Sequence, residues 1–164
     1  MTTITVTGTT SVSKHIANTT GYVVDGGTLD VLSGGVISGP IDVVQGSVDV
    51  RSGGVTDSTV LEGQFTFMSV EGVANSTTVS NFAQLTINNS GTANFGTVVG
   101  NVTVNAGGVA NSMTVGAGGV VMVEFGSAII NGMTFSGGSA FVQGLAVSTT
   151  IVAGGSITVD FGSA

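Results

Sequence analysis

The sequence predicts an all-β chain that folds as a right-handed parallel β-solenoid of about eight rungs, each 17–20 residues long. Two series of glycines recur with a period of about eighteen residues, and short segments of alternating apolar and other residues separate them. No stretch shows the 3.6-residue period of an amphipathic helix. We expect the solenoid to span residues 22–164. Residues 1–21, rich in Ser and Thr, are expected to form an N-terminal cap or a partial rung.

The corners of the rungs are expected at the recurring glycines, because glycine adopts a positive φ angle without steric cost. The first series is Gly35, Gly54, Gly72, Gly91, Gly108, Gly126, Gly144 and Gly162. The second series is Gly27, Gly46, Gly63, Gly100, Gly119, Gly138 and Gly155, with Ala83 in the place of one member.

One strand of each rung is expected between a glycine of the second series and the next glycine of the first. Its three central residues have apolar first and third members, which should point inward, and a variable middle residue. These triplets are 29–31, 48–50, 65–67, 85–87, 102–104, 121–123, 140–142 and 157–159.

A second strand carries an apolar series that we also expect to point inward: Val23, Val43, Val60, Val79, Val98, Val115, Phe135 and Ile151. From the third rung onward a threonine precedes each member, and these threonines should face outward as a column open to glycosylation or surface contact: Thr59, Thr78, Thr97, Thr114, Thr134 and Thr150. The simpler interpretation is that Thr suits an exposed strand.

A third, shorter strand begins at Val36, Val55, Val73, Thr92, Val109 and Leu145. It leads to a polar series, expected to be structural, in which stacked amides hydrogen-bond from rung to rung at a turn: Asp57, Asn75, Asn94, Asn111 and Asn131.

Three phrases carry a resemblance to a known family: VLSGGV at 31–36, VRSGGV at 50–55 and VNAGGVANSMTV at 104–115. They resemble the strand-loop-strand repeats of AIDA-type self-associating autotransporter adhesins, over about residues 22–164. The resemblance implies a right-handed β-solenoid passenger, exported to the bacterial surface, that promotes aggregation, biofilm formation and adhesion. It also implies that Ser and Thr side chains can carry heptose.

Charge and composition limit the partners. Lys14 and Arg51 are the two basic residues against nine acidic ones, giving a net charge of −7, so nucleic acid is not expected to bind. The chain has no cysteine and therefore no disulfide or thiolate metal site. No run approaches 18 consecutive apolar residues, so no membrane insertion is expected. The start shows no signal peptide. We expect an extracellular or bacterial cell-surface location.

No catalytic residue, metal site or cofactor is expected. The single histidine, His15, is interpreted as structural or solvent-exposed. Asp30 and Asp49 should be outward neighbours on successive rungs, where a carboxylate pair could act in glycoside hydrolysis or hold a cation. The simpler interpretation is that both acids keep an exposed sheet soluble.

The leading hypothesis is a non-enzymatic extracellular structural or adhesive protein that forms homo-oligomers or filaments and contacts surface glycans. Met122 and Phe141 are candidates for a lateral contact, because both should be apolar and outward. Ile157, Val159 and Phe161 are candidates for an end-to-end contact through an open last rung. A carbohydrate-active or carbohydrate-binding β-helix is the first alternative, and an ice-binding protein is the second.

Overall fold

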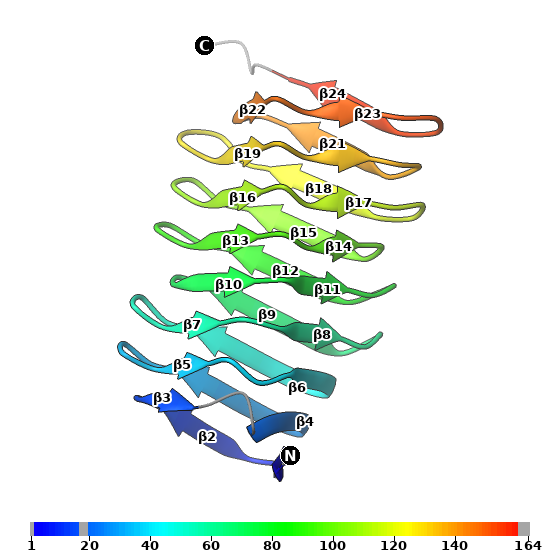
Figure 1. Cartoon of the computed structure of the whole chain (residues 1–164). Helices are drawn as coiled ribbons and strands as arrows, with labels where there is room; N and C mark the ends of the chain where they lie inside the picture. Colours follow the sequence, from blue (N-terminus) through cyan, green and yellow to red (C-terminus); the bar gives the residue numbers. More distant parts are fainter. Residues whose placement is uncertain (1, 17–19, 161–164) are drawn as a thin grey trace.

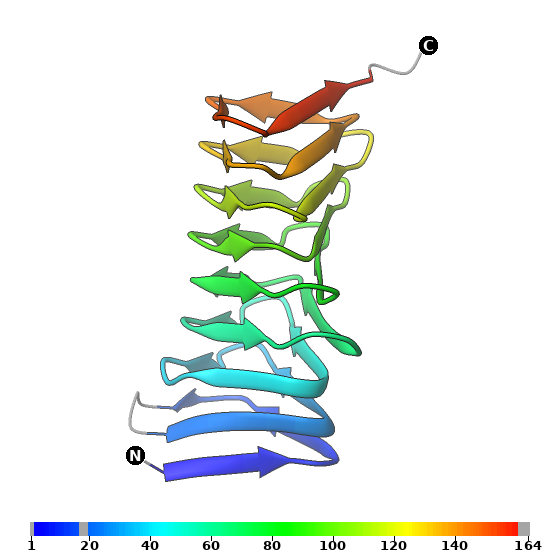
Figure 2. The same ribbon diagram turned by 90° about the vertical axis from the view of Figure 1, so that its right-hand side faces the viewer.

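The computed structural model describes residues 2–16 and 20–160 as a rod of stacked rungs, with parallel strands and no helix among these residues. The rungs rise level by level from the N-terminus to the C-terminus (Figures 1 and 2). In Figure 1 the near strands run from left to right and the paler strands behind them run back as the coil rises, which is a right-handed winding. The predicted fold class is confirmed.

Each rung contributes strands to three faces. Face A is an eight-stranded sheet, one strand per rung: β3 (His15–Ile16), β5 (Val36–Ile37), β7 (Val55–Thr56), β10 (Val73–Asn75), β13 (Thr92–Asn94), β16 (Val109–Asn111), β19 (Ile129–Asn131) and β22 (Leu145–Val147).

Faces B and C belong to one sixteen-stranded sheet. The strands β4 (Thr20–Val31) and β6 (Ile41–Val50) run through both faces. Face B continues with β8 (Thr59–Leu61), β11 (Thr77–Val79), β14 (Thr97–Val98), β17 (Thr114–Val115), β20 (Thr134–Phe135) and β23 (Thr150–Ile151). Face C continues with β9 (Thr66–Val70), β12 (Gln84–Ile87), β15 (Asn101–Val104), β18 (Val120–Val123), β21 (Ser139–Val142) and β24 (Ser156–Val159).

The N-terminal segment continues the three-face pattern. β1 (Thr2–Val6) and β2 (Thr9–Val12) pair in parallel with the two halves of β4, and β3 pairs with β5. Val6, Val12 and Ile16 thereby stand beside Val24, Val31 and Ile37. A division of the chain into a cap at 1–21 and a repeat domain at 22–164 stays a prediction.

The core consists of columns of apolar side chains, one member per rung, placed by the register of the strands. The column on face C is Leu29, Val48, Met68, Leu85, Val102, Val121 and Ala140. The column on face B is Val24, Val43, Leu61, Val79, Val98, Val115 and Phe135. All these side chains are buried, so the rod is filled by stacked hydrocarbon rather than hollow.

Four predicted inward positions are wrong: Val23, Val60, Phe65 and Phe67. Val23 and Val60 face outward, because Val24 pairs with Val43 and Val43 pairs with Leu61. The triplet 65–67 is also misplaced, since Met68 and Val70 occupy the core positions beside Val48 and Val50. Val43 and Val48 are five residues apart, but their partners Leu61 and Met68 are seven apart, so the turn between faces B and C is two residues longer in this rung than in the one before. Together with the one-residue shift at Leu61, this places the face C strand three residues later than predicted. When the repeats are aligned by their glycines, this shift in the position of the strand is not visible.

The positive φ angle predicted for the recurring glycines is observed at Gly46, Gly63 and Gly126, but most members of the first series serve a different purpose. Gly35, Gly54, Gly72, Gly91 and Gly108 do not have positive φ angles. In four of these rungs the positive φ falls on the preceding residue: Gly34, Gly53, Ser90 and Gly107. At Gly91 a Cβ would collide with the backbone oxygen of Val70 in the rung below. Close approach of two rungs therefore requires these glycines. Gly126 is not equivalent to them, because Ala128 stands next to Ile129, the register partner of Val109.

Four of the five predicted members, Asp57, Asn75, Asn94 and Asn111, form the ladder through three hydrogen bonds, while Asn131 is aligned with Asn111 in register without a side-chain bond to it. Asn75 Nδ2 donates to Asp57 Oδ1 at 3.0 Å, and Asn94 Nδ2 donates to Asn75 Oδ1 at 3.0 Å. Asn111 Nδ2 then donates to Asn94 Oδ1 at 2.9 Å. The positive φ angle expected of the asparagines falls instead on the residues that follow them, Ser76, Phe95 and Ser112.

A second ladder was not predicted. Asn88 Nδ2 donates to Ser69 Oγ at 2.9 Å, and Asn105 Nδ2 donates to Asn88 Oδ1 at 2.8 Å. Both ladders tie neighbouring rungs together near the C-terminal ends of strands, the first on face A and the second on face C.

Replacing Val98 by Asp should lower the free energy of unfolding by more than about 3 kcal/mol, because the carboxylate would lie unpaired in the apolar column. The same change at Val60, which faces outward, should cost less than about 1 kcal/mol. Urea unfolding followed by circular dichroism measures both values. Equal destabilisation by the two variants would contradict the observed register.

Replacing Asn94 by Ala should cost about 1–3 kcal/mol, because it removes one bond donated to Asn75 and one accepted from Asn111. Asn89, which is exposed, is the control, and its change to Ala should cost less than about 0.5 kcal/mol. A loss at Asn94 no larger than that at Asn89 would show that the ladder contributes nothing to stability.

Candidate functional site

Five of the six predicted threonines form an outward column on face B. Register pairing aligns Thr78, Thr97, Thr114, Thr134 and Thr150, and the column continues through Val60, Asp42 and Val23 toward the N-terminus. Thr97, Thr114 and Thr150 are exposed, while Thr78 and Thr134 are half-buried. Their hydroxyls are thus available to solvent or to a modifying enzyme.

Thr59 was wrongly assigned to this column. It pairs with Ile41 and Thr77 and is fully buried, because Leu61, two residues later on the same strand, points into the core. The hydroxyls of Thr59 and Thr77 have no hydrogen-bond partner, and neither has that of Thr56 on face A. Such buried, unpaired hydroxyls reduce stability.

The acidic pair is held by a cation from the chain itself. Asp30 and Asp49 are register partners, and Arg51 Nη2 lies 3.3 Å from Asp30 Oδ1 and 3.2 Å from Asp49 Oδ2. Burial raises the pKa of the Asp49 carboxyl, the Arg51 guanidinium opposes this shift, and the charges of Asp30 and Glu71 add to it. The arrangement is a surface ion pair rather than two free carboxylates.

His15 is exposed on β3, at the edge of face A. Within residues 2–16 and 20–160, no group of three or more His, Asp or Glu side chains comes together in a way that could hold a metal ion.

An apolar patch lies on face C where the sequence places Met122 and Phe141. These two residues are register partners on β18 and β21 and are 45% and 37% exposed. Val120, two residues before Met122 on the same strand, is 37% exposed and joins them. We call Val120, Met122 and Phe141 the face C patch.

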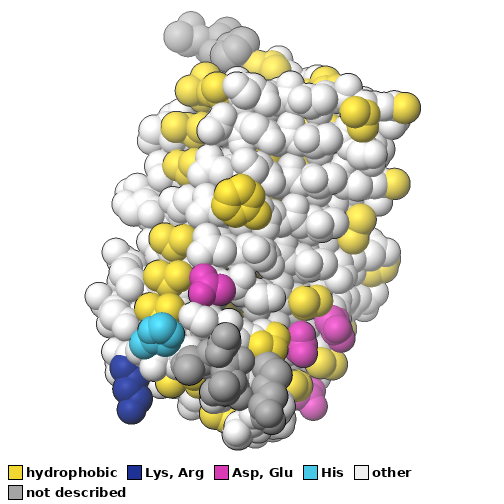
Figure 3. Space-filling model, in the orientation of Figure 1, with side chains coloured by type: hydrophobic (Ala, Val, Ile, Leu, Met, Phe, Trp, Pro, Cys, Tyr) yellow, Lys and Arg dark blue, Asp and Glu magenta, His cyan; other side chains and the backbone are white. Residues whose placement is uncertain are grey.

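Charge is distributed unevenly along the rod. Seven of the nine acidic residues and both basic residues lie within residues 14–71, and between 72 and 159 the one charged residue is Glu124. In Figure 3 the coloured charges gather in the lower, N-terminal part of the visible face and the upper part shows none. The face C patch therefore lies on the weakly charged half.

The last described rung has apolar residues at its open side. Ile157 is half-buried and pairs with Ala140, while Val159 pairs with the buried Val142 and is itself exposed. A further rung, whatever its source, would cover Val159. The third residue of the predicted end-to-end contact, Phe161, lies outside the described residues.

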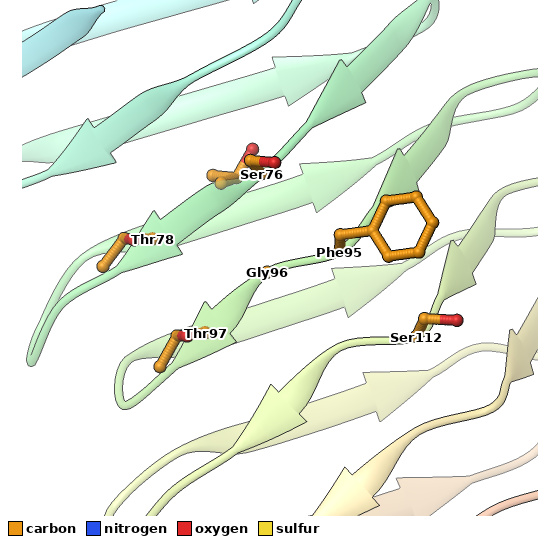
Figure 4. Close-up of a pocket in the computed structure, with 7 residues that line it drawn as sticks. Ser76, Thr78, Phe95, Gly96, Thr97 and Ser112 are labelled. Carbon is orange, nitrogen blue, oxygen red and sulfur yellow. The ribbon is translucent and has the colours of Figure 1, made fainter.

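A groove that sequence reasoning missed lies at the corner between faces A and B. It has a volume of about 300 Å³ and is lined by Ser76, Thr77, Thr78, Phe95, Gly96, Thr97 and Ser112. Figure 4 shows the Phe95 ring on one side of Gly96 and the side chains of Thr78 and Thr97 on the other. The sequence did contain a signal for this groove. Asn75 and Asn111 are each followed by serine, whereas the equivalent Asn94 is followed by Phe95.

Comparison with known proteins supports the fold. No family model and no curated protein matches the sequence. Among solved structures, the chain is similar to the TibC-catalyzed hyper-glycosylated TibA55-350 fragment, with a TM-score of 0.67 and 22% sequence identity. The similarity covers 96% of this chain and 66% of that fragment, so this chain spans about two thirds of its length. None of the described residues forms a helix that is long and apolar enough to cross a membrane.

Replacing Thr59 by Val should raise the free energy of unfolding by about 1 kcal/mol, because a methyl group takes the place of a buried hydroxyl without a partner. Thr97, in the exposed column, is the matched control, and its change to Val should leave stability within about 0.5 kcal/mol. Thermal and urea unfolding measure both. A clear loss of stability in the Thr59 variant would mean that its hydroxyl has a partner in solution.

Proposed function

We propose that this chain is a non-enzymatic, extracellular structural or adhesive β-solenoid that associates with copies of itself. The face C patch is the observation that carries the proposal. The same outward column holds Thr86 and Thr103 in the two preceding rungs, so polar residues fit this position. Exposing Met122 and Phe141 in the next two rungs is unfavourable unless another surface covers them.

The charge distribution favours a second copy as that surface. Two chains that met through the face C patch would bring together their weakly charged halves. In each chain, Glu124 is the one charged residue between positions 72 and 159. The acidic N-terminal parts, which carry most of the net charge of −7, would stay apart if the two rods ran in opposite directions. A two-fold contact of this kind is self-complementary.

End-to-end stacking is a second mode of association. Among the described residues, β24 pairs on one side only, with β21, and β1, β2 and β3 also pair on one side only. The first rung of another copy would pair with β24 and cover the exposed side chain of Val159. Such a contact is heterologous and would produce filaments. Ile157 and Val159 are the described residues that it would bury.

The proposal places the chain at a cell surface. The resemblance to AIDA-type repeats and the fold shared with a hyper-glycosylated TibA fragment both support this location. The exposed threonines of face B, namely Thr97, Thr114 and Thr150, are the proposed positions of glycosylation. A sugar chain there would leave face C free for contact with another copy.

Sedimentation velocity over a range of protein and salt concentrations tests self-association. The unmodified chain should form larger species as concentration and salt increase, because salt screens the net charge. The double change Met122→Lys and Phe141→Lys should keep the chain monomeric, since a buried ammonium group without a partner opposes the contact.

The control is Thr86→Lys, in the same outward column and away from the patch. Each added lysine makes the net charge less negative, so a general charge effect would strengthen association rather than weaken it. A chain that stays monomeric under all conditions would refute the proposal. Association of the double variant equal to that of the parent would refute the role of the face C patch.

A further inference from the structure

We propose that the groove beside Phe95 binds a neutral sugar unit of a surface glycan, which stacks on the phenyl ring and hydrogen-bonds to the surrounding hydroxyls. The inference rests on the adhesive function proposed above and gives it a ligand class and a site. It uses a different part of the rod from the face C patch, because the groove lies at the corner of faces A and B.

Phe95 is exceptional at its own corner. Ser76, Phe95 and Ser112 each follow an asparagine of the ladder, and their φ angles are 54°, 53° and 53°. The two serines show that the left-handed corner forms without an aromatic residue. A bulky side chain is disfavoured in this conformation, and the Phe95 ring is 63% exposed, so it adds little to the core. Phe65 and Phe82 also have positive φ angles and exposed rings, and what distinguishes Phe95 from them is the groove that its side chain lines.

Gly96 lines the groove next to the ring, at a place where the rungs approach too closely for a side chain. A Cβ at this position would meet the backbone oxygen of Thr77 and would lie 2.6 Å from Met113 Cε. The next residue, Thr97, and its register partner Thr78 stand on the far side of Gly96 from the ring (Figure 4). The result is a shallow trough with an aromatic wall and a row of hydroxyls.

The lining selects the class of ligand. Five of the seven lining residues are Ser or Thr, one is Phe, one is Gly, and none is charged. The face of a pyranose ring that carries axial C–H bonds is apolar and slightly positive, which suits the negative face of a phenyl ring. The sugar hydroxyls both donate and accept hydrogen bonds, as the hydroxyls of Ser and Thr do.

Other ligand classes fit the lining less well. A phosphate or a sulfated sugar would find no cationic side chain, because none lines the groove. An apolar peptide would bury the Ser and Thr hydroxyls without partners, which is unfavourable. The hydroxyl of Thr77 is buried inside the rod, so the hydroxyls left to meet a ligand are those of Ser76, Thr78, Thr97 and Ser112. The volume of about 300 Å³ lies at the lower end of the range of small-ligand pockets, as expected for one or two sugar rings.

Saturation-transfer-difference NMR with a panel of neutral hexasaccharides tests the inference. The panel contains cellohexaose, maltohexaose, laminarihexaose, mannohexaose and N-acetylchitohexaose. At least one should give signals on its axial protons with the unmodified chain. Phe95→Ser should weaken binding by about tenfold or more, the size of effect that loss of one stacking contact produces. Phe95→Tyr should retain binding.

Phe82→Ser is the matched control. Phe82 also has a positive φ angle, of 68°, and is 59% exposed, but it lies in the turn between faces B and C, outside the groove. The Phe82→Ser variant should bind the oligosaccharide as the unmodified chain does. Because Ser76 and Ser112 already occupy the corner, Phe95→Ser should fold normally, and its thermal midpoint verifies this.

Three results would overturn the inference: no signal from any member of the panel, unchanged binding by Phe95→Ser, or an equal loss with Phe82→Ser. The test is separable from that of self-association, because Phe95→Ser should sediment as the parent does. Sugar binding without self-association would support the groove and refute the face C contact. Self-association without sugar binding would support the face C contact and refute the groove.

Discussion

The hydrogen bonding of each rung to the next is the constraint on which the rest of the molecule depends. Every strand pairs in parallel with its counterpart one turn along the chain, so each side chain has a fixed neighbour above and below. Parallel pairing at about 4.8 Å leaves no room for a side chain where two corners approach, which explains the glycine at position 91. It also brings asparagine amides within bonding distance on successive rungs.

Because stacking repeats every outward position along the rod, a residue that departs from its column identifies a place with a separate role. Phe95 stands between two serines at its corner, and Met122 and Phe141 follow two threonines on face C. Neither departure improves the packing of the core. The two core columns that contain Leu29 and Val24, in contrast, change only among apolar residues of different size, such as Val115 and Phe135. Buried threonines such as Thr59 occur in other inward columns.

Sequence reasoning predicted the class of fold and most of the core, because an alternating pattern with a fixed period determines both. It failed where turn length varies. The longer turn before Met68 moved the core positions away from Phe65 and Phe67, and the same rung placed Leu61 rather than Val60 inside, which buried Thr59. The Phe95 groove was missed because its members come from three rungs and two faces, and no local pattern joins them.

The stacking register is tested most directly by backbone nuclear Overhauser effects between successive rungs in an isotope-labelled chain. The register places Val43 beside Leu61 and Val48 beside Met68, so cross-strand contacts between the amide and Hα protons of these residues should be observed. Contacts that join Val43 to Val60 as its direct partner, or Val48 to Phe65, would contradict it. They would also return Thr59 to the surface.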